Sequence, residues 1–123
     1  MNGKILVDTN ILVELLEGNS RIASYITDIE ICISGITEIE LLSNPALSKS
    51  DVTIIEELLK LCIKFDVLLP EIKLEASKYR RKKIIKKTPD AIIAGTAKYY
   101  SIPLLTMDKD FKSLSDVDVI IID

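Results

Sequence analysis

Short apolar runs rich in β-branched residues alternate along this chain with segments whose apolar residues recur at helical spacing. The predicted strands cover residues 4–8, 29–34, 66–70, 102–106 and 117–122. The predicted helices cover residues 9–19, 37–44, 51–64, 71–87 and 90–100, with another helical turn or two at 20–28. Strands separated by helices favour a parallel sheet with helices on both faces. The alternation therefore predicts an α/β fold with a parallel central sheet of four to five strands.

Helix-breaking and capping residues set the predicted helix limits. Pro45 is predicted to stop the helix at 37–44, because proline cannot continue a helix. Thr88 is predicted to cap the last helix, with Pro89 at its first helical position. The inner face of the 71–87 helix is predicted to carry Ile72, Ala76 and Tyr79.

The length of 123 residues predicts a single domain that spans residues 1–123. A hydrophobic content of 48% is sufficient for one buried core and argues against disorder. The apolar runs are much shorter than the roughly 20 residues that cross a bilayer. The first residues carry acids within their apolar pattern, which is unlike a secretory signal. We therefore expect a cytoplasmic protein without a membrane partner.

Histidine is absent from the chain, and cysteine occurs only at Cys32 and Cys62. The absence of imidazole excludes Ser-His-Asp and Cys-His catalysis and makes a zinc site improbable. Both cysteines lie in apolar segments, so they are predicted to be buried free thiols. Any chemistry must come from carboxylates, hydroxyls, lysines or a bound hard cation.

Acidic residues occur where the predicted strands end. Asp8 ends the first strand, and Asp108 and Asp110 follow the fourth. Asp90 lies in the first turn of the helix before that strand, and Glu40 lies one turn into the helix after the second. Ligands of open parallel sheets bind beyond the carboxyl ends of the strands, so these acids can converge at one edge. Each also has a purely structural interpretation, as an N-cap, a favourable charge at a helix start, a turn residue or an exposed helical acid.

Convergence of these acids creates a need for positive charge. Two carboxylates about 5 Å apart repel each other by roughly 3 kcal/mol at an effective dielectric constant near 20. Four of them in one cleft require protons or a bound cation. Oxygen ligands without histidine or cysteine suit Mg²⁺ or Mn²⁺. Such ions activate water and stabilise the charge of a phosphoryl transition state.

Four sequence blocks carry a resemblance to a known family. They are "VDTNIL" at the first strand, "SGITEIELL" at 34–42, "PDAIIAGTA" at 89–97 and "LLTMDKDF" at 104–111. In this order and spacing they resemble the motif blocks of PIN-domain nucleases, specifically the VapC-type toxins. The resemblance implies a single PIN-like domain and a Mg²⁺- or Mn²⁺-dependent endoribonuclease.

The resemblance also implies a site. It places Asp8, Glu40, Asp90 and Asp108 as catalytic and metal-binding residues. It adds Asp110 as a further acid near the metal, with Asn10 and Thr106 lining the site. Glu38 competes with Glu40 within the second block, and the helical wheel does not separate them, so Glu40 is chosen by motif register. Cleavage within single-stranded or looped RNA is the expected mode, because unpaired segments can bend into a narrow cleft.

Residues 78–87 hold seven of the sixteen Lys and Arg residues in a chain whose net charge is −3. The remainder carries nine Lys and Arg against nineteen Asp and Glu, a charge near −10 that repels RNA. The run ends three residues before Asp90, so it is predicted to guide phosphates to the acidic edge. Arg80, Arg81, Lys82 and Lys83 are predicted to include phosphate contacts, although a solvated face of the 71–87 helix explains any single lysine equally well.

Other functions have weaker support. A haloacid dehalogenase-type phosphatase needs a second Asp two positions after the first, where Asn10 stands. A response-regulator receiver needs paired acids near the first strand and a lysine after the last strand, and the final segment "VDVIIID" ends without that lysine. A non-catalytic PIN-like RNA- or protein-binding module and a housekeeping RNA-processing nuclease remain alternatives. VapC-type relatives imply a homodimer and a small cognate antitoxin that covers the acidic cleft.

Overall fold

The computed structural model describes residues 3–123, which form one sheet of five strands in which every neighbouring pair is parallel. The strands are β1 (Lys4–Val7), β2 (Glu30–Ser34), β3 (Ile63–Phe65), β4 (Leu104–Thr106) and β5 (Val119–Ile121). The helices are α1 (Thr9–Leu16), α2 (Ser20–Tyr25), α3 (Gly35–Leu42), α4 (Lys49–Lys60), α5 (Pro70–Arg81) and α6 (Thr88–Tyr100), with a short 3₁₀ helix η1 (Lys109–Ser113). The predicted α/β fold with a central parallel sheet is confirmed.

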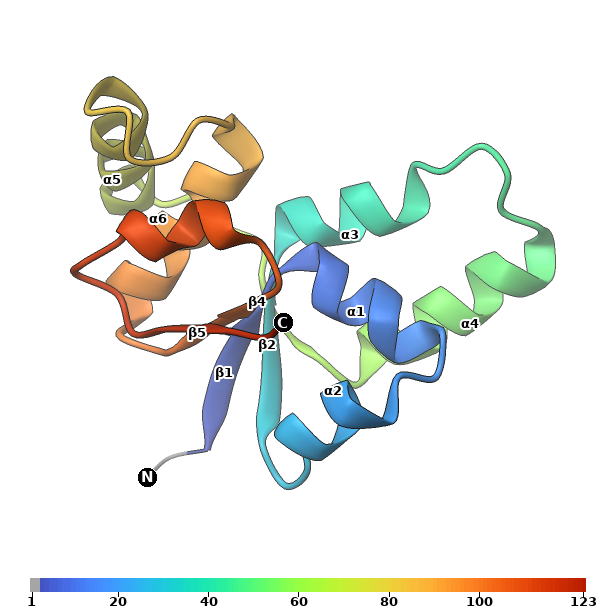
Figure 1. The fold of residues 1–123 in the computed structure, drawn as a ribbon. Coiled ribbons are helices and arrows are strands. Elements are labelled where there is room, and N and C mark those ends of the chain that lie inside the picture. Colours follow the sequence, from blue (N-terminus) through green and yellow to red (C-terminus); the bar gives the residue numbers. More distant parts are fainter. Residues whose placement is uncertain (1–2) are drawn as a thin grey trace.

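Successive side chains of β1 point to opposite faces of the sheet and join two separate cores. Ile5 and Val7 belong to a core covered by α1, α2, α3 and α4. Leu6 belongs to the other core, which α5 and α6 cover. Figure 1 shows these two helical layers on either side of the sheet. Both faces are thus closed, as the continuous apolar character of the strands predicts.

The strand order β3-β2-β1-β4-β5 places β1 at the centre of the sheet. The chain moves outward from β1 through β2 to β3, and then crosses back to place β4 on the other side of β1. The order of the strands therefore reverses between β1 and β4. Open parallel sheets bind ligands in the crevice at such a point, beyond the carboxyl ends of the strands.

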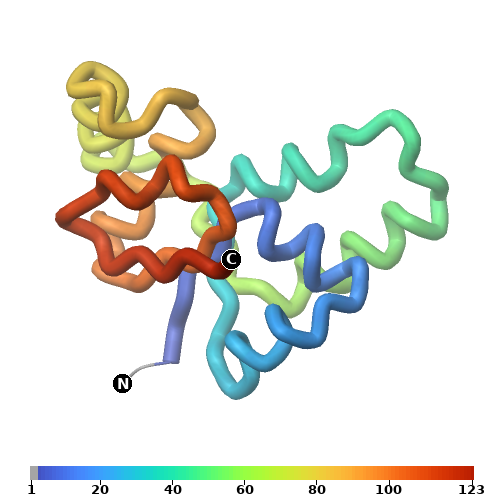
Figure 2. Tube along the Cα trace, viewed as in Figure 1, coloured from blue at the N-terminus to red at the C-terminus, as the bar shows by residue number. Residues whose placement is uncertain are grey.

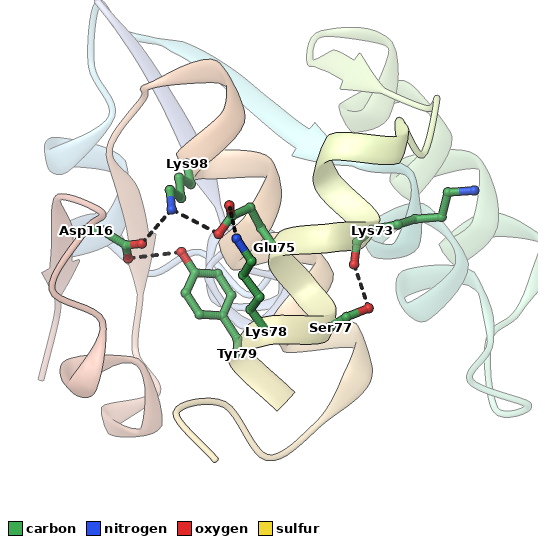
Figure 3. Close-up of polar contacts among 7 residues, drawn as sticks. All are labelled: Lys73, Glu75, Ser77, Lys78, Tyr79, Lys98 and Asp116. Carbon is green, nitrogen blue, oxygen red and sulfur yellow. Dashed lines mark hydrogen bonds and ion pairs between the residues drawn. The ribbon is translucent and has the colours of Figure 1, made fainter. Parts of the chain in front are cut away.

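Helices α5 and α6 pack closely and are joined by a polar network. A side chain at Gly95 of α6 would place its Cβ 3.1 Å from the carbonyl oxygen of Ile72 on α5, so glycine permits this approach. Figure 3 shows Lys98 of α6 between Glu75 of α5 and Asp116, at Nζ–oxygen distances of 2.9 and 3.0 Å. The Tyr79 hydroxyl donates to Asp116 Oδ1 at 3.0 Å. The network fixes α5 against α6 and the segment that precedes β5.

The third strand lies earlier than predicted. Residues 66–70 were expected to form it, but β3 is Ile63–Phe65 and the predicted helix at 51–64 is Lys49–Lys60. The helix begins early because Ser48 and Asp51 form a capping box, and its cap at Leu61 frees the next residues to pair with β2. Val67 and Leu68 made the following segment look strand-like, but both are exposed in a loop.

The long basic helix is also shorter than predicted. It covers Pro70–Arg81 instead of 71–87, because Lys83 adopts a left-handed backbone with φ of 58° that no helix can continue. Thr88 was expected to cap α6, but Lys87 is the cap residue and no side chain caps this helix. The helix expected at 37–44 is Gly35–Leu42, with Ser34 as its cap.

Ile72, Ala76 and Tyr79 are buried, which confirms the predicted inner face of α5. Both cysteines are free thiols; Cys32 is buried as expected, and Cys62 is only half-buried. No helix within residues 3–123 is long and apolar enough to cross a membrane.

Candidate active site

Asp8 lies at the carboxyl end of β1, where it also forms the N-cap of α1. Its Oδ1 accepts a hydrogen bond from the Thr9 backbone N–H at 2.8 Å, and its Oδ2 accepts one from the Thr106 hydroxyl at 2.7 Å. The Asp8 N–H donates to the Leu105 carbonyl of β4 at 2.9 Å, which extends the pairing of the two central strands. The carboxylate is therefore buried and held in one orientation at the point where the strand order reverses.

Thr106, the last residue of β4, connects Asp8 with Asp108. Its hydroxyl donates to Asp8 and accepts a hydrogen bond from the Asp108 N–H at 3.0 Å. Asp108 in turn caps η1, because its Oδ1 accepts from the Asp110 N–H at 2.9 Å. One buried hydroxyl thus orients the loop that places the second acid beside the first.

Glu40 extends from α3 toward the start of α1. Its Oε1 accepts a hydrogen bond from the Thr9 hydroxyl at 2.6 Å, and that hydroxyl lies 3.1 Å from the buried Thr37 hydroxyl oxygen. Glu38, the alternative acid of this helix, is instead paired with Lys64 of β3 at 2.9 Å. The structure therefore places Glu40, and not Glu38, on the side of Asp8.

A cleft of about 300 Å³ brings four of the acids together. Asp90 reaches it from the first turn of α6, which arrives from the face of the sheet opposite to α1 and α3. The residues that line the cleft are Asp8, Thr9, Asn10, Val13, Glu40, Lys87, Pro89, Asp90 and Asp108. The convergence expected from the strand ends is thus present in the fold.

The electrostatics of the cleft disfavour so much negative charge. Burial, followed by the charges of Asp8 and Asp108, raises the pKa of Asp90 to about 6, while Lys87 opposes the rise. Burial also raises the pKa of Asp8, although its hydrogen bonds from Thr106 and Thr9 act in the other direction. A raised pKa means that the fold disfavours the charged form of a carboxyl group, so a bound proton or a nearby cation stabilises it. The cleft is therefore suited to bind positive charge.

The donor set suits a hard divalent cation, since it consists of oxygen atoms. The Asn10 Oδ1 atom is buried at this cleft and is the one buried side-chain N or O atom within residues 3–123 without a hydrogen-bond partner. No three carboxylate or cysteine side chains within these residues already surround a common point. Coordination of one ion by several of them therefore requires rotation of the more exposed side chains, Glu40, Asp90 and Asp108.

Other predicted residues lie outside this cleft. Asp110 is exposed on η1 and does not line it. Lys82 lines a separate depression beside Tyr79 and Lys98. None of the four cations predicted to contact phosphate, Arg80, Arg81, Lys82 and Lys83, is part of the cleft lining. Their role stays a prediction.

The sequence did not predict four residues of the lining, Thr9, Val13, Lys87 and Pro89. Thr9 had a signal, because it directly follows Asp8 and a helix start brings the next side chains to the same edge. Lys87 also had one, because it precedes Asp90 by three residues, which is the spacing of neighbours on a helix. That signal was obscured by the expectation that residues 71–87 form one continuous helix.

The family model for the PIN domain matches residues 5–117. The chain belongs to the PIN domain family. Its fold is similar to a toxin–antitoxin complex from Klebsiella pneumoniae, with 27% identity, a TM-score of 0.79, and coverage of 92% of this chain and 94% of that chain. A comparison with curated protein sequences gives no significant match.

Two further solved structures show the same PIN fold. FitAcB from Neisseria gonorrhoeae has 27% identity and a TM-score of 0.70, with coverage of 94% of this chain and 95% of that chain. VapBC2 from Rickettsia felis, bound to a DNA fragment from its promoter, has 18% identity and a TM-score of 0.82, with coverage of 98% and 99%. The acidic cleft described above is therefore a feature of a PIN domain whose neighbours include toxin–antitoxin complexes.

Proposed function

We propose that this PIN domain is a metal-dependent endoribonuclease and the toxin of a toxin–antitoxin pair. One observation carries the proposal: carboxylates from β1, α3, α6 and the loop after β4 line a single cleft at the switch point of the sheet. The similarity to the Klebsiella pneumoniae toxin–antitoxin complex, at 27% identity over most of both chains, supports the toxin assignment.

The proposed cofactor is Mg²⁺ or Mn²⁺, held by Asp8, Glu40, Asp90 and Asp108, with Asp110 as a further acid. When bound, such an ion activates water and neutralises charge on the phosphate and the leaving oxygen. The absence of histidine from the chain agrees with this chemistry, because general base catalysis by imidazole is not available.

The protein's own groups orient the proposed site. Thr106 and the Thr9 N–H fix Asp8, so this carboxylate needs no reorganisation when substrate arrives. The Thr9 hydroxyl positions Glu40, and the Asn10 carbonyl oxygen offers a further acceptor. Asp90 completes the rim from the start of α6, and Asp108 completes it from the loop after β4. A single-stranded or looped RNA is the proposed substrate, because its backbone can bend into the cleft.

Cations at the end of α5 are proposed to attract the RNA backbone. Arg80, Arg81, Lys82 and Lys83 are all exposed. Replacing them with glutamine should raise the dissociation constant for RNA and flatten its dependence on salt, since each lost phosphate contact reduces the slope. Unchanged binding of single-stranded RNA would assign these residues to ordinary surface.

We also propose a homodimer and a small antitoxin as partners in the cytoplasm. Two apolar depressions offer surfaces for proteins, because exposed apolar clusters mark sites of association. One is lined by Ile36, Ile39, Phe65, Val67 and Leu68, and the other by Leu15, Leu16, Ile54, Leu58 and Leu61. Light scattering that gives a monomer at high micromolar concentration would contradict the dimer.

The nuclease proposal is tested by incubating the purified protein with an RNA pool and Mg²⁺ or Mn²⁺. Cleavage should cease in EDTA and fall by about 10²–10³-fold in the Asp8→Asn variant. Cleavage that persists in EDTA, or that continues at the wild-type rate in Asp8→Asn, contradicts a metal nuclease built on Asp8. RNA binding without cleavage by the wild-type protein would instead support a non-catalytic binding module.

The toxin proposal needs a test in cells. Induced expression of the wild-type protein should arrest bacterial growth, and expression of Asp8→Asn at the same level should not. Normal growth with a protein that is active in the RNA assay would favour a housekeeping RNA-processing nuclease.

A further inference from the structure

Lys87 is the single cation among the residues that line the acidic cleft. Within residues 3–123, Lys87 forms no salt bridge, whereas Lys60, Lys64, Lys78 and Lys98 each pair with an acid. An unpaired ammonium group beside several carboxylates is available to an anionic ligand.

The backbone that carries Lys87 is held by a defined turn. After α5, the Ile84 N–H donates to the Tyr79 carbonyl at 2.9 Å and the Lys83 N–H donates to the Arg80 carbonyl at 3.1 Å. These two bonds, with Lys83 in the left-handed region, form a Schellman motif. Figure 2 shows the chain turning back after α5 (yellow) and entering α6 (orange).

Two anchors fix this turn to the rest of the protein. Ile85, only 1% exposed, inserts into the core between the turn and α6. Tyr79, whose carbonyl accepts the hydrogen bonds of the turn, is tied through its hydroxyl to Asp116, as Figure 3 shows. The segment therefore delivers Lys87 to the cleft from a rigid support, while its side chain remains exposed.

The start of α6 adds a second attraction for anions. Lys87 is the cap residue of this 13-residue helix, and Pro89 has no N–H, so among the described residues the N–H groups of Thr88 and Asp90 are the ones at its start that no side chain caps. Free N–H groups and the helix dipole favour negative charge at this end. The cleft thus combines carboxylates, which reject a polyanion, with a cation and a helix start, which attract one.

We propose that Lys87 binds a non-bridging oxygen of the RNA phosphate that lies in the acidic cleft. The inference rests on the proposed nuclease function and names the residue that positions its substrate. Lys87 contacts the phosphate directly, whereas the cations at the end of α5 lie outside the cleft lining and act on neighbouring phosphates. The carboxylates alone would repel the substrate, so this contact offsets part of that repulsion at the reacting group.

Three variants test the role of Lys87. Lys87→Gln removes the charge, Lys87→Arg retains it, and Lys86→Gln removes the same charge from the adjacent exposed residue, which does not line the cleft. Binding of a short labelled single-stranded RNA is measured in EDTA over a range of KCl concentrations. Lys87→Gln should raise the dissociation constant by about 3–10-fold and reduce the salt slope by about 0.7, the value for one phosphate contact on a single strand.

Cleavage with Mg²⁺ provides a second measurement. Lys87→Gln should lower kcat/KM by about 10–100-fold, as expected for loss of a positioned charge, while Lys87→Arg recovers most of the loss. Lys86→Gln should change both measurements much less than Lys87→Gln does, because Lys86 belongs to the basic run but does not line the cleft. Thermal unfolding of each variant controls for a loss of fold.

The outcomes separate this inference from the nuclease proposal. If Lys87→Gln and Lys86→Gln bind and cleave RNA equally, the inference about Lys87 is wrong while the nuclease proposal stands. If the wild-type protein cleaves no RNA but Lys87→Gln still weakens binding more than Lys86→Gln, the nuclease proposal fails and the phosphate contact is supported. A fall in stability without a specific loss of RNA binding would assign Lys87 a structural role and overturn the inference.

Discussion

The two ends of helix α6 carry clusters of charge with opposite characters. Near its C-terminus, Lys98 pairs with Glu75 and Asp116, and Asp116 also accepts a hydrogen bond from Tyr79. At its N-terminus, Asp90 lies in a cleft with three other carboxylates and a single cation. One cluster satisfies its charges with partners from the chain, and the other does not.

The pKa values record this difference. Partial burial alone would raise the pKa of Asp116, but hydrogen bonds from Lys98 and Tyr79 outweigh it and hold the pKa below its usual value. Burial and neighbouring charges raise the pKa of Asp90 to about 6. A fold gains from the first arrangement and loses from the second. Charges that cost stability are retained where they serve a function, so the difference supports a functional site at the N-terminal end of α6.

The largest expected effect is a difference in RNA cleavage between variants of the acidic cleft and variants of the paired cluster at the other end of α6. Asp8→Asn should lower RNA cleavage by about 10²–10³-fold, because it removes a charge from the centre of the proposed site. Asparagine is also a good N-cap, so α1 should still form. Asp116→Asn makes the same chemical change in the paired cluster and should alter kcat/KM by less than about twofold. Similar losses in both variants, measured in single-turnover assays with Mg²⁺, would remove the functional distinction between the clusters.

The next effect concerns stability, with opposite signs at the two ends. The raised pKa of Asp90 means that the folded state binds more protons than the unfolded state between about pH 4 and 6, so stability falls as pH rises through this window. Asp90→Asn should therefore stabilise the protein above pH 6. Allowing for solvent screening of this half-buried group, the gain is about 1–2 kcal/mol, and it should disappear below pH 4.

Asp116→Asn is the matched change and should destabilise the protein by about 0.5–1 kcal/mol at neutral pH, since its partly exposed pairs are screened. The pKa of Asp116 is lowered, so its contribution is present above its unfolded pKa and is lost as pH falls through its folded pKa. Urea unfolding in EDTA at pH 4 and pH 7.5 measures both variants. Effects of the same sign at pH 7.5 would contradict the contrast drawn between the clusters.

Divalent cations should bind only at the acidic cleft, at the N-terminal end of α6. Mg²⁺ or Mn²⁺ at about ten times the dissociation constant should stabilise the folded protein by about 1.4 kcal/mol, because it binds the folded cleft and not the unfolded chain. The resulting increase in Tm should be absent in Asp8→Asn and preserved in Asp116→Asn. An equal increase in both variants, measured by thermal unfolding, would place the ion outside the acidic cleft.

Much of the fold and of the cleft could be predicted from the sequence, for identifiable reasons. The alternation of strands and helices determines a parallel sheet, and the carboxyl ends of parallel strands share one edge. Asp8 and Asp108, which follow two of these strands, therefore had to lie at that same edge of the sheet. Glu40 and Asp90 follow from helices that begin at that edge or lead to it.

The features that were not predicted depend on contacts between distant segments. The strand expected at 66–70 moved to Ile63–Phe65, because pairing with β2 decides which apolar residues extend the sheet. The place of Lys87 depends on where α5 ends. The helix ends at Arg81 because Lys83, two residues further on, has a left-handed backbone, which composition does not indicate. The paired cluster of Tyr79, Lys98 and Asp116 joins residues up to 37 positions apart and carries no local signal.

The smallest expected effect concerns the turn between α5, which contributes Glu75 and Tyr79 to the paired cluster, and the start of α6 at the acidic cleft. Lys83 occupies the left-handed position of the Schellman motif, which costs a residue with a Cβ roughly 1–2 kcal/mol. Lys83→Gly removes that strain but adds unfolded-state entropy, so a net gain of about 0.5–1 kcal/mol is expected by urea unfolding. Lys83→Ala removes the charge and retains the Cβ, so it should show no gain. If Lys83→Ala weakens RNA binding while Lys83→Gly stabilises the fold, the strained lysine is retained for its charge, and the turn contributes to RNA binding together with the acidic cleft. If RNA binding is unchanged in both variants, the turn only connects the two helices.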